Sequence, residues 1–181
     1  MNKIIVVVDM QNDFVDGTLG SAEALKIVQP VKKYLETQVD SKDIVIFTRD
    51  THYESEESIE VKSLPSHCVK NTRGHEIVDE LKEWINRHKE TILLDKNSFM
   101  SKDLSNLIIK EIQNRNLDEK NLQIEIFGLC TDICVISNAL ALRGYFIDTP
   151  INVHKKLCAG SSPEAHLLAL GVMKNNLIHI V

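Results

Sequence analysis

The sequence lacks several features that would point to particular classes of protein. Its 181 residues contain no run near the roughly 18 consecutive apolar residues that a membrane-spanning helix needs. The net charge of −5 provides no basic surface, which argues against a nucleic-acid partner. The seven glycines do not cluster, and no Gly-x-Gly-x-x-Gly segment is present to cradle a phosphate. We therefore expect neither a membrane protein nor a nucleic-acid-binding protein.

Cysteine is scarce, and no secretion signal is visible. The chain has four cysteines, and Cys130 and Cys134 are separated by three residues rather than the two of a redox Cys-x-x-Cys pair. The apolar run after Lys3 ends at Asp9, which is too short and too quickly acidic for a signal peptide. These features predict a reduced, cytoplasmic protein.

Apolar runs alternate with helical patterns along the chain. Runs typical of strands occur at Ile4–Val8, Ile44–Thr48, Thr91–Leu94, Leu122–Phe127, Tyr145–Val153 and Leu177–Val181. Helical patterns occur at Ser21–Gln38 with an interruption near Pro30, at Ile77–His88, at Leu104–Ile112 with Ser101 as the cap, after Cys130, and from Ser162. The alternation predicts an α/β domain spanning residues 1–181, with a parallel sheet between two layers of helices.

The segment Gly128–Cys134 carries the strongest chemical signal. The apolar strand Leu122–Phe127 runs into it, and a helical pattern follows with Thr131 placed as an N-cap. Cys134 then lies in the first turn, where unpaired N–H groups and the helix dipole favour the thiolate and can hold an oxyanion. The alternative is that Cys134 is a small buried hydrophobic residue, as most free cysteines are.

Two further candidates also lie where strands end. Asp9 follows the first apolar run, and Lys96 follows the third. In a parallel sheet these side chains can meet Cys134 in one crevice, where a carboxylate takes the thiol proton and an ammonium stabilises the anions. Taken singly, Asp9 could instead cap a turn and Lys96 could be a solvated loop charge.

The long polar segment 50–74 contains a second cluster of chemical groups. Asp50 and His52 form an Asp-x-His pair, and Glu60 and His67 follow. Two imidazoles with one or two carboxylates suit zinc, manganese or iron. The alternative is that polar loops contain such residues anyway, and we treat three neighbouring glutamates as this kind of background: Glu54, Glu56 and Glu57.

Together these residues resemble the isochorismatase-like cysteine hydrolases, and among them most closely the nicotinamidase/pyrazinamidase group. The similarity runs nearly from end to end. It rests on five motifs that occur in the family's order: Val8-Asp9-Met10-Gln11-Asn12-Asp13-Phe14, Asp50-Thr51-His52, Leu64-Pro65-Ser66-His67-Cys68, Asp95-Lys96 and Cys130-Thr131-Asp132-Ile133-Cys134.

The resemblance implies a three-layer α/β/α fold with a mainly parallel six-stranded sheet. It implies a catalytic triad of Asp9, Lys96 and Cys134. It further implies a cis peptide bond between Leu129 and Cys130, and an oxyanion hole formed by the backbone N–H groups of Cys130 and Cys134. It also implies one divalent metal ion, with zinc expected ahead of manganese or iron, held by Asp50, His52, Glu60 and His67.

A substrate pocket lined by Phe14, Leu64 and Phe99 also follows from the resemblance, although Leu64 stands where nicotinamidases commonly have Trp or Phe. We therefore expect a homo-oligomeric, metal-containing nicotinamidase that acts on a small amide through a cysteine thioester. One alternative is a related cysteine hydrolase acting on another small amide, ureide or carbamoyl compound. A second alternative is a non-catalytic metal or thiol sensor that uses Cys68, Cys130 and Cys134.

Overall fold

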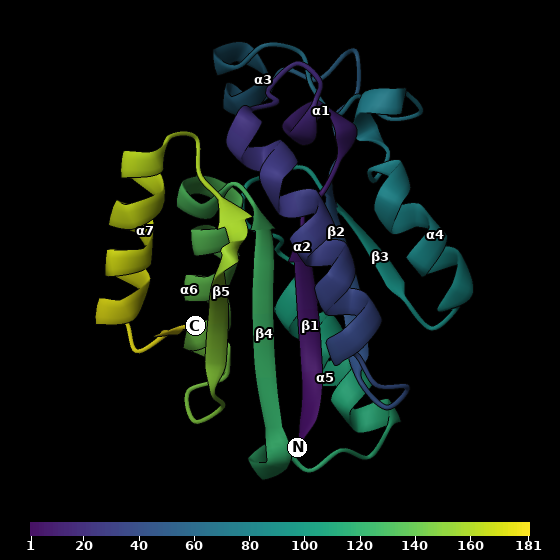
Figure 1. The fold of residues 1–181 in the computed structure, drawn as a ribbon, viewed down its shortest axis with the longest axis vertical. Helices are drawn as coiled ribbons and strands as arrows, with labels where there is room; N and C mark the ends of the chain where they lie inside the picture. Colours follow the sequence, from purple (N-terminus) through teal and green to yellow (C-terminus); the bar gives the residue numbers. More distant parts are fainter.

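Six parallel strands form one sheet through the middle of the protein (Figure 1). The computed structural model describes residues 1–181. The strands lie in the order β3-β2-β1-β4-β5-β6, and every neighbouring pair is parallel. Their bounds are β1 Asn2–Val8, β2 Ile44–Asp50, β3 Ile92–Lys96, β4 Leu122–Leu129, β5 Ile151–Ala159 and β6 His179–Ile180. The predicted fold class is therefore confirmed.

Helices cover both faces of this sheet. α2 and α4 pack together on one face, and α5, α6 and α7 lie on the other, as right-handed crossovers require (Figure 1). Their bounds are α2 Ala22–Gln38, α4 Asp79–Arg87, α5 Leu104–Asn114, α6 Ile136–Tyr145 and α7 Pro163–Asn175. Two short helices, α1 (Asn12–Val15) and α3 (Ile59–Ser63), lie beyond the carboxyl ends of the strands. None of the helices is both long and apolar enough to span a bilayer.

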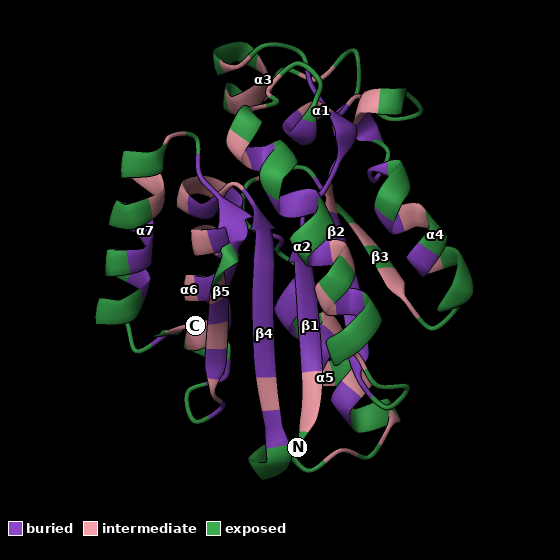
Figure 2. Ribbon diagram, viewed as in Figure 1, coloured by how far each residue is buried: buried purple, intermediate pink, exposed green.

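The central strands are apolar on both faces because both faces are covered. Residues Ile4–Val8 of β1 have no exposed surface, and Figure 2 shows this burial along β1 and β4. Gly128 in β4 has a φ of +127°, and a Cβ there would lie 2.1 Å from the backbone oxygen of Val8. Glycine is therefore required where β1 and β4 approach each other.

The chain changes direction between β1 and β4. From β1 it winds outward to β2 over one face, whereas from β4 it winds outward to β5 over the other. The loops that leave the two strands therefore diverge and open a crevice at the carboxyl ends. Ligands bind at such switch points in open parallel sheets. Asp9 and the Cys134 segment follow the two strands that flank this crevice.

Two of the expected element boundaries are wrong. α2 continues through Pro30 without interruption, because its apolar face is buried along its whole length against the core. The segment Tyr145–Val153 is not extended throughout. α6 reaches Tyr145, and Arg143 donates hydrogen bonds to the backbone oxygens of Phe146 and Thr149, which hold a turn until β5 begins.

Of the two helix caps expected from the sequence at Ser101 and Ser162, the structure contains one. Ser162 caps α7 as predicted, and its hydroxyl accepts a hydrogen bond of 3.1 Å from the backbone N–H of Ala165. Ser101 does not cap α5, which begins after Asp103. The backbone N–H of Ser101 instead donates to the side-chain oxygen of Asn138, so a tertiary contact replaces the local one.

Candidate active site

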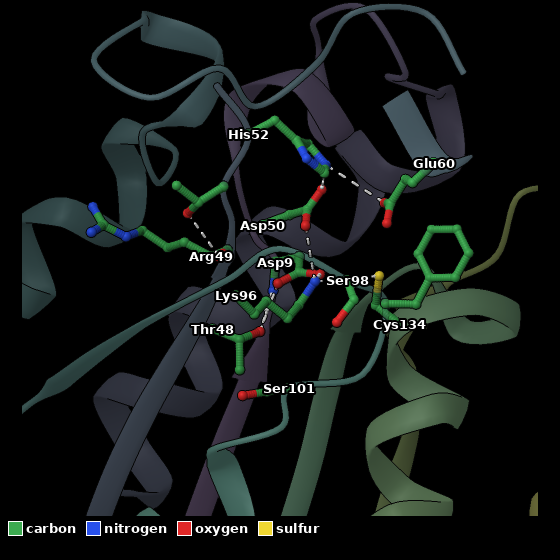
Figure 3. Close-up of polar contacts among 12 residues, drawn as sticks. Asp9, Thr48, Arg49, Asp50, His52, Glu60, Lys96, Ser98, Ser101 and Cys134 are labelled. Atoms are coloured by element: carbon green, nitrogen blue, oxygen red, sulfur yellow. Dashed lines mark hydrogen bonds and ion pairs between the residues drawn. The ribbon is translucent and has the colours of Figure 1, made fainter. Parts of the chain in front are cut away.

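Three side chains from separate strands meet at the crevice (Figure 3). Asp9 directly follows β1, Lys96 ends β3, and Cys134 lies in a short π-turn, Thr131–Val135, after β4. The ammonium nitrogen of Lys96 lies 2.7 Å from Oδ2 of Asp9 and 3.7 Å from the sulfur of Cys134. All three residues are buried. The structure therefore brings together the three residues that the sequence singles out as candidates for catalysis.

Asp9 is held by its own backbone and by β2. Its φ of +48° is left-handed, a conformation that aspartate tolerates better than most residues. Its Oδ1 accepts a hydrogen bond of 2.6 Å from the hydroxyl of Thr48, and its backbone N–H donates to the Thr48 carbonyl at 3.2 Å. These contacts leave Oδ2 directed at Lys96.

The element that carries Cys134 differs from the expected one. Thr131 is not an N-cap; its hydroxyl instead contacts Nδ1 of His166 at 2.8 Å. Cys130 occupies the capping position, and its carbonyl accepts the backbone N–H of Val135 in the wider spacing of a π-turn. The peptide bond between Leu129 and Cys130 is cis, as the resemblance implies.

Electrostatics in the crevice favour a neutral thiol beside an ion pair. Burial raises the pKa of Cys134 well above its usual value, and the Asp9 charge raises it further. The expectation that the helix N-terminus favours the resting thiolate is therefore wrong, because burial outweighs it. Burial also raises the pKa of Asp9, although the ammonium of Lys96 opposes that change. A carboxylate with a raised pKa is a better proton acceptor than an ordinary one.

Lys96 remains charged despite its burial. Burial alone lowers the pKa of Lys96, but the surrounding acidic groups outweigh this effect and raise it above its usual value. The ammonium lies 3.4 Å from Oδ1 of Asp50 as well as beside Asp9. One positive charge therefore faces two buried carboxylates and the sulfur.

Four side chains next to this group form a candidate metal centre. The ligand atoms of Asp50, His52, Glu60 and His67 all lie within 4.8 Å of one another. Oδ2 of Asp50 is 2.9 Å from Nε2 of His52 and 3.3 Å from Nε2 of His67, and Glu60 completes the group at 3.7 Å from both imidazoles. Figure 3 shows Asp50 between His52 and Lys96.

The donor set fits a divalent transition metal. Nδ1 of His67 contacts the carbonyl of Pro65 at 2.8 Å, and Nδ1 of His52 contacts Glu56 at 3.1 Å, so both Nε2 atoms face the centre. Nε2 of His67 is buried without a hydrogen-bond partner, as expected of a ligand atom. The hydrogen bond to Asp50 raises the pKa of His52 to about 10.

Sequence reasoning missed two residues that position this centre. Glu56, which we assigned to the polar background, orients His52; its spacing of four residues from His52 is the available signal. Gln11 is fully buried, and its amide bonds the backbone of Asp50 twice, donating to the carbonyl at 2.8 Å and accepting from the N–H at 2.7 Å. No local pattern reveals the contact of Gln11, because the two residues are 39 positions apart.

A small apolar cavity of about 230 Å³ leads to Cys134. This volume is below the roughly 300–1,000 Å³ of pockets for drug-sized ligands, which suits a substrate with a single ring. The three predicted pocket residues, Phe14, Leu64 and Phe99, all line it, as does Glu60 from the candidate metal centre. Other lining residues that the sequence analysis did not identify include Leu19, Ile133 and Ser161.

Asn138 is a further residue that sequence reasoning missed. It is buried on α6, one turn after Cys134. Its amide nitrogen donates to the carbonyls of Cys134 at 2.8 Å and Phe99 at 3.0 Å, and its oxygen accepts the N–H of Ser101 at 2.9 Å. One side chain thus joins the cysteine to a wall of the cavity.

Comparisons with known proteins agree with the fold and indicate the family. The Isochorismatase domain family model matches residues 3–181. The nicotinamidase of Saccharomyces cerevisiae is 25% identical over 174 residues, covering 77% of this chain and 80% of that protein. Two solved structures superpose over 99–100% of each chain. The pyrazinamidase/nicotinamidase of Streptococcus mutans has a TM-score of 0.85 and 26% sequence identity. The pyrazinamidase of Pyrococcus horikoshii in complex with zinc has a TM-score of 0.82 and 27% sequence identity. An N-carbamoylsarcosine amidase from Thermoplasma acidophilum is also similar, with a TM-score of 0.75 and 26% identity over 99% of this chain and 95% of that one.

Proposed function

Because the chain belongs to the isochorismatase domain family, we propose that it is a nicotinamidase, an amidohydrolase that converts nicotinamide and water to nicotinate and ammonia. The observation that carries the proposal is the meeting of Asp9, Lys96 and Cys134 at a small apolar cavity. The four residues of the candidate metal centre border that cavity through Glu60.

The proposed cofactor is one divalent metal ion held by Asp50, His52, Glu60 and His67. Zinc is the first candidate, since a similar pyrazinamidase binds it, and manganese and iron suit the same donors. When bound, the metal supplies a Lewis acid for the ring nitrogen of the substrate. The cavity then directs the carboxamide toward the sulfur, and the apolar side chains of Phe14 and Phe99 face the ring.

The first half of the reaction transfers the acyl group to sulfur. Asp9 takes the proton of the Cys134 thiol while the sulfur attacks the carboxamide carbon. The backbone N–H groups of Cys130 and Cys134 stabilise the resulting oxyanion. Asp9 then gives the proton to the amide nitrogen, the C–N bond breaks, and ammonia leaves. Lys96 stays protonated throughout. Its positive charge stabilises the carboxylate of Asp9 or the thiolate of Cys134, whichever is ionised.

The second half releases the acid. Asp9 takes a proton from water, and the oxygen attacks the thioester carbon. The C–S bond breaks, the carboxylic acid forms, and Asp9 returns the proton to the Cys134 sulfur. Both halves use the same base and the same oxyanion site, so one compact group of side chains is sufficient for the cycle.

An ammonia-release assay with nicotinamide tests this proposal. We expect turnover by the metal-loaded protein and loss of turnover, by at least about 1,000-fold, in Cys134→Ala. Cys158→Ala is the matched control, since Cys158 is a buried free cysteine of β5 that does not line the cavity. Wild-type ammonia release by Cys134→Ala would refute the mechanism.

A second candidate function is hydrolysis of a small ureido or carbamoyl compound. The similarity to an N-carbamoylsarcosine amidase favours it, as does Leu64, an aliphatic side chain where an aromatic one would clamp a flat ring. The ratio of kcat/KM for nicotinamide to that for an N-carbamoyl amino acid, measured before and after chelation, separates the two. Faster, chelator-insensitive turnover of the carbamoyl compound would replace the nicotinamidase proposal.

A further inference from the structure

The outer face of α7 is open to solvent (Figure 2) and carries apolar residues. Leu167 is 67% exposed, Leu168 72% and Val172 45%, although all three lie in the middle of a regular helix. The opposite side of α7 is buried against its own chain through Ala169, Leu170 and Met173. Contiguous exposed apolar side chains of this kind mark contact surfaces.

Two residues on this surface run against local preference. Gly171 lies inside α7 on the exposed face, and a Cβ there would meet nothing within 4 Å, so no contact within the chain requires glycine. Alanine would favour the helix more strongly at that position. Leu177, which follows α7, is 76% exposed and has a φ of +59°, a conformation that glycine adopts more readily. Gly171 is smaller than the helix favours, and Leu177 stands where a turn favours glycine. Because no contact within the chain explains either residue, both indicate a contact outside the chain.

A groove of about 470 Å³ joins these two residues. Gly171 and Lys174 of α7 line it, together with Leu177 and Ile180. Ile180 belongs to β6, the short strand at the edge of the sheet. The missing side chain of Gly171 therefore leaves the groove open along the exposed side of α7.

We propose that this face is a two-fold interface with a second copy of the chain, in which the two α7 helices pack antiparallel. Leu167 and Leu168 lie four and three residues before Gly171, and α-helical spacing of about 100° per residue places all three on the same face. A two-fold axis between positions 169 and 170 sets Leu168 over Gly171 of the partner. The same axis sets Leu167 against Val172 of the partner.

Charge supports a second copy as the occupant. A two-fold interface must be complementary to itself, since each surface meets its own image. α7 carries Glu164 in its first turn and Lys174 in its last turn. Antiparallel packing brings Glu164 of each copy beside Lys174 of the other, so both ends of the contact pair opposite charges around an apolar centre. This inference does not depend on the proposed enzymatic activity.

Sedimentation equilibrium of the purified protein tests the interface. We expect wild type at micromolar concentration to sediment with twice the 20.5 kDa mass of one chain. Leu168→Glu should weaken the dimer at least about 30-fold, as for a central interface residue. Leu25→Glu, at a comparably exposed leucine of α2, should leave it unchanged. A monomeric wild type, or a Leu168→Glu protein as dimeric as wild type, would overturn the inference.

The register is tested separately by cross-linking. Under oxidation, a mixture of Leu167→Cys and Val172→Cys proteins should give a disulfide-linked dimer. Each variant alone should give much less, because neither position faces itself across the axis. Equal cross-linking in all three samples would refute the antiparallel register, and a circular dichroism spectrum identical to wild type shows that each variant is folded.

Discussion

Replacing Lys96 with methionine removes the buried ion pair with Asp9, together with the longer contact to Asp50. Asp9 is fully buried and the Lys96 side chain is only 2% exposed, so water cannot replace the lost contact. At the observed 2.7 Å and an effective dielectric constant of about 20, the attraction is about 6 kcal/mol before desolvation is subtracted. Removing one member of such a pair leaves the other charge buried without a partner, which lowers the free energy of unfolding by about 3–5 kcal/mol. We expect Lys96→Met to lower the free energy of unfolding by about that amount.

The double variant Asp9→Asn/Lys96→Met removes both charges at nearly constant volume. Replacing a whole buried pair with uncharged groups is often close to neutral, so most of the stability lost in Lys96→Met should return. Activity should not return, because the double variant has no base to take the Cys134 proton. The double variant should therefore recover stability without recovering catalysis.

Urea unfolding followed by circular dichroism measures both effects, with metal concentration held constant because bound metal adds to the apparent stability. Asp9→Asn completes the double-mutant cycle. A double variant that is destabilised by the sum of the two single changes would show that Asp9 and Lys96 are not coupled. A loss below about 1 kcal/mol in Lys96→Met would refute the reasoning directly, since exposed pairs contribute only that much.

Three further predictions follow from the packing. Gly128→Ala places a Cβ 2.1 Å from the Val8 backbone oxygen at a positive φ and should cost at least about 3 kcal/mol in urea unfolding; an unchanged midpoint would contradict this. Asn138→Ala loses three hydrogen bonds, two of them fully buried, and should cost about 2–4 kcal/mol and raise KM, whereas Asn114→Ala on the exposed end of α5 should change neither. Glu56→Gln should weaken metal binding about 10-fold in a competition titration, and equal weakening by the surface change Glu57→Gln would refute a specific role.

Much of the fold could be predicted from the sequence because its signals are local. The continuous β-branched run of β1 and the Ser162-Pro163-Glu164 start of α7 each encode their own structure within a few residues. The errors arose where distant contacts decide. Proline normally interrupts a helix, but α2 continues through Pro30 because residues on either side are anchored in the core. The Arg143 contacts that form the turn before β5 are likewise invisible in a local pattern.

The residues of the candidate site could be predicted from the sequence. The side chains that hold them in place and the protonation state of Cys134 could not. Asp9, Lys96 and Cys134 stand at strand ends, and topology alone brings strand ends together. The supporting contacts link positions far apart in sequence: Gln11 holds the backbone of Asp50, and Asn138 joins the Cys134 turn to Phe99, each across 39 positions. The state of the Cys134 thiol depends on depth of burial, which the helix position does not report. The roles of the triad remain the prediction that the Cys134→Ala assay tests.

The charges in the crevice link the candidate metal centre to the proposed triad. Asp9, Asp50 and Glu60 contribute three negative charges and Lys96 one positive charge, which leaves an excess of two negative charges. A divalent cation cancels that excess. Without it, burial lowers the pKa of His67, but the adjacent carboxylates of Asp50 and Glu60 outweigh this effect and raise it to about 9; the same carboxylates raise the pKa of His52. Because Asp50 faces Lys96 through one oxygen and the imidazoles through the other, we expect chelation to perturb the ion pair with Asp9 as well as the binding of substrate.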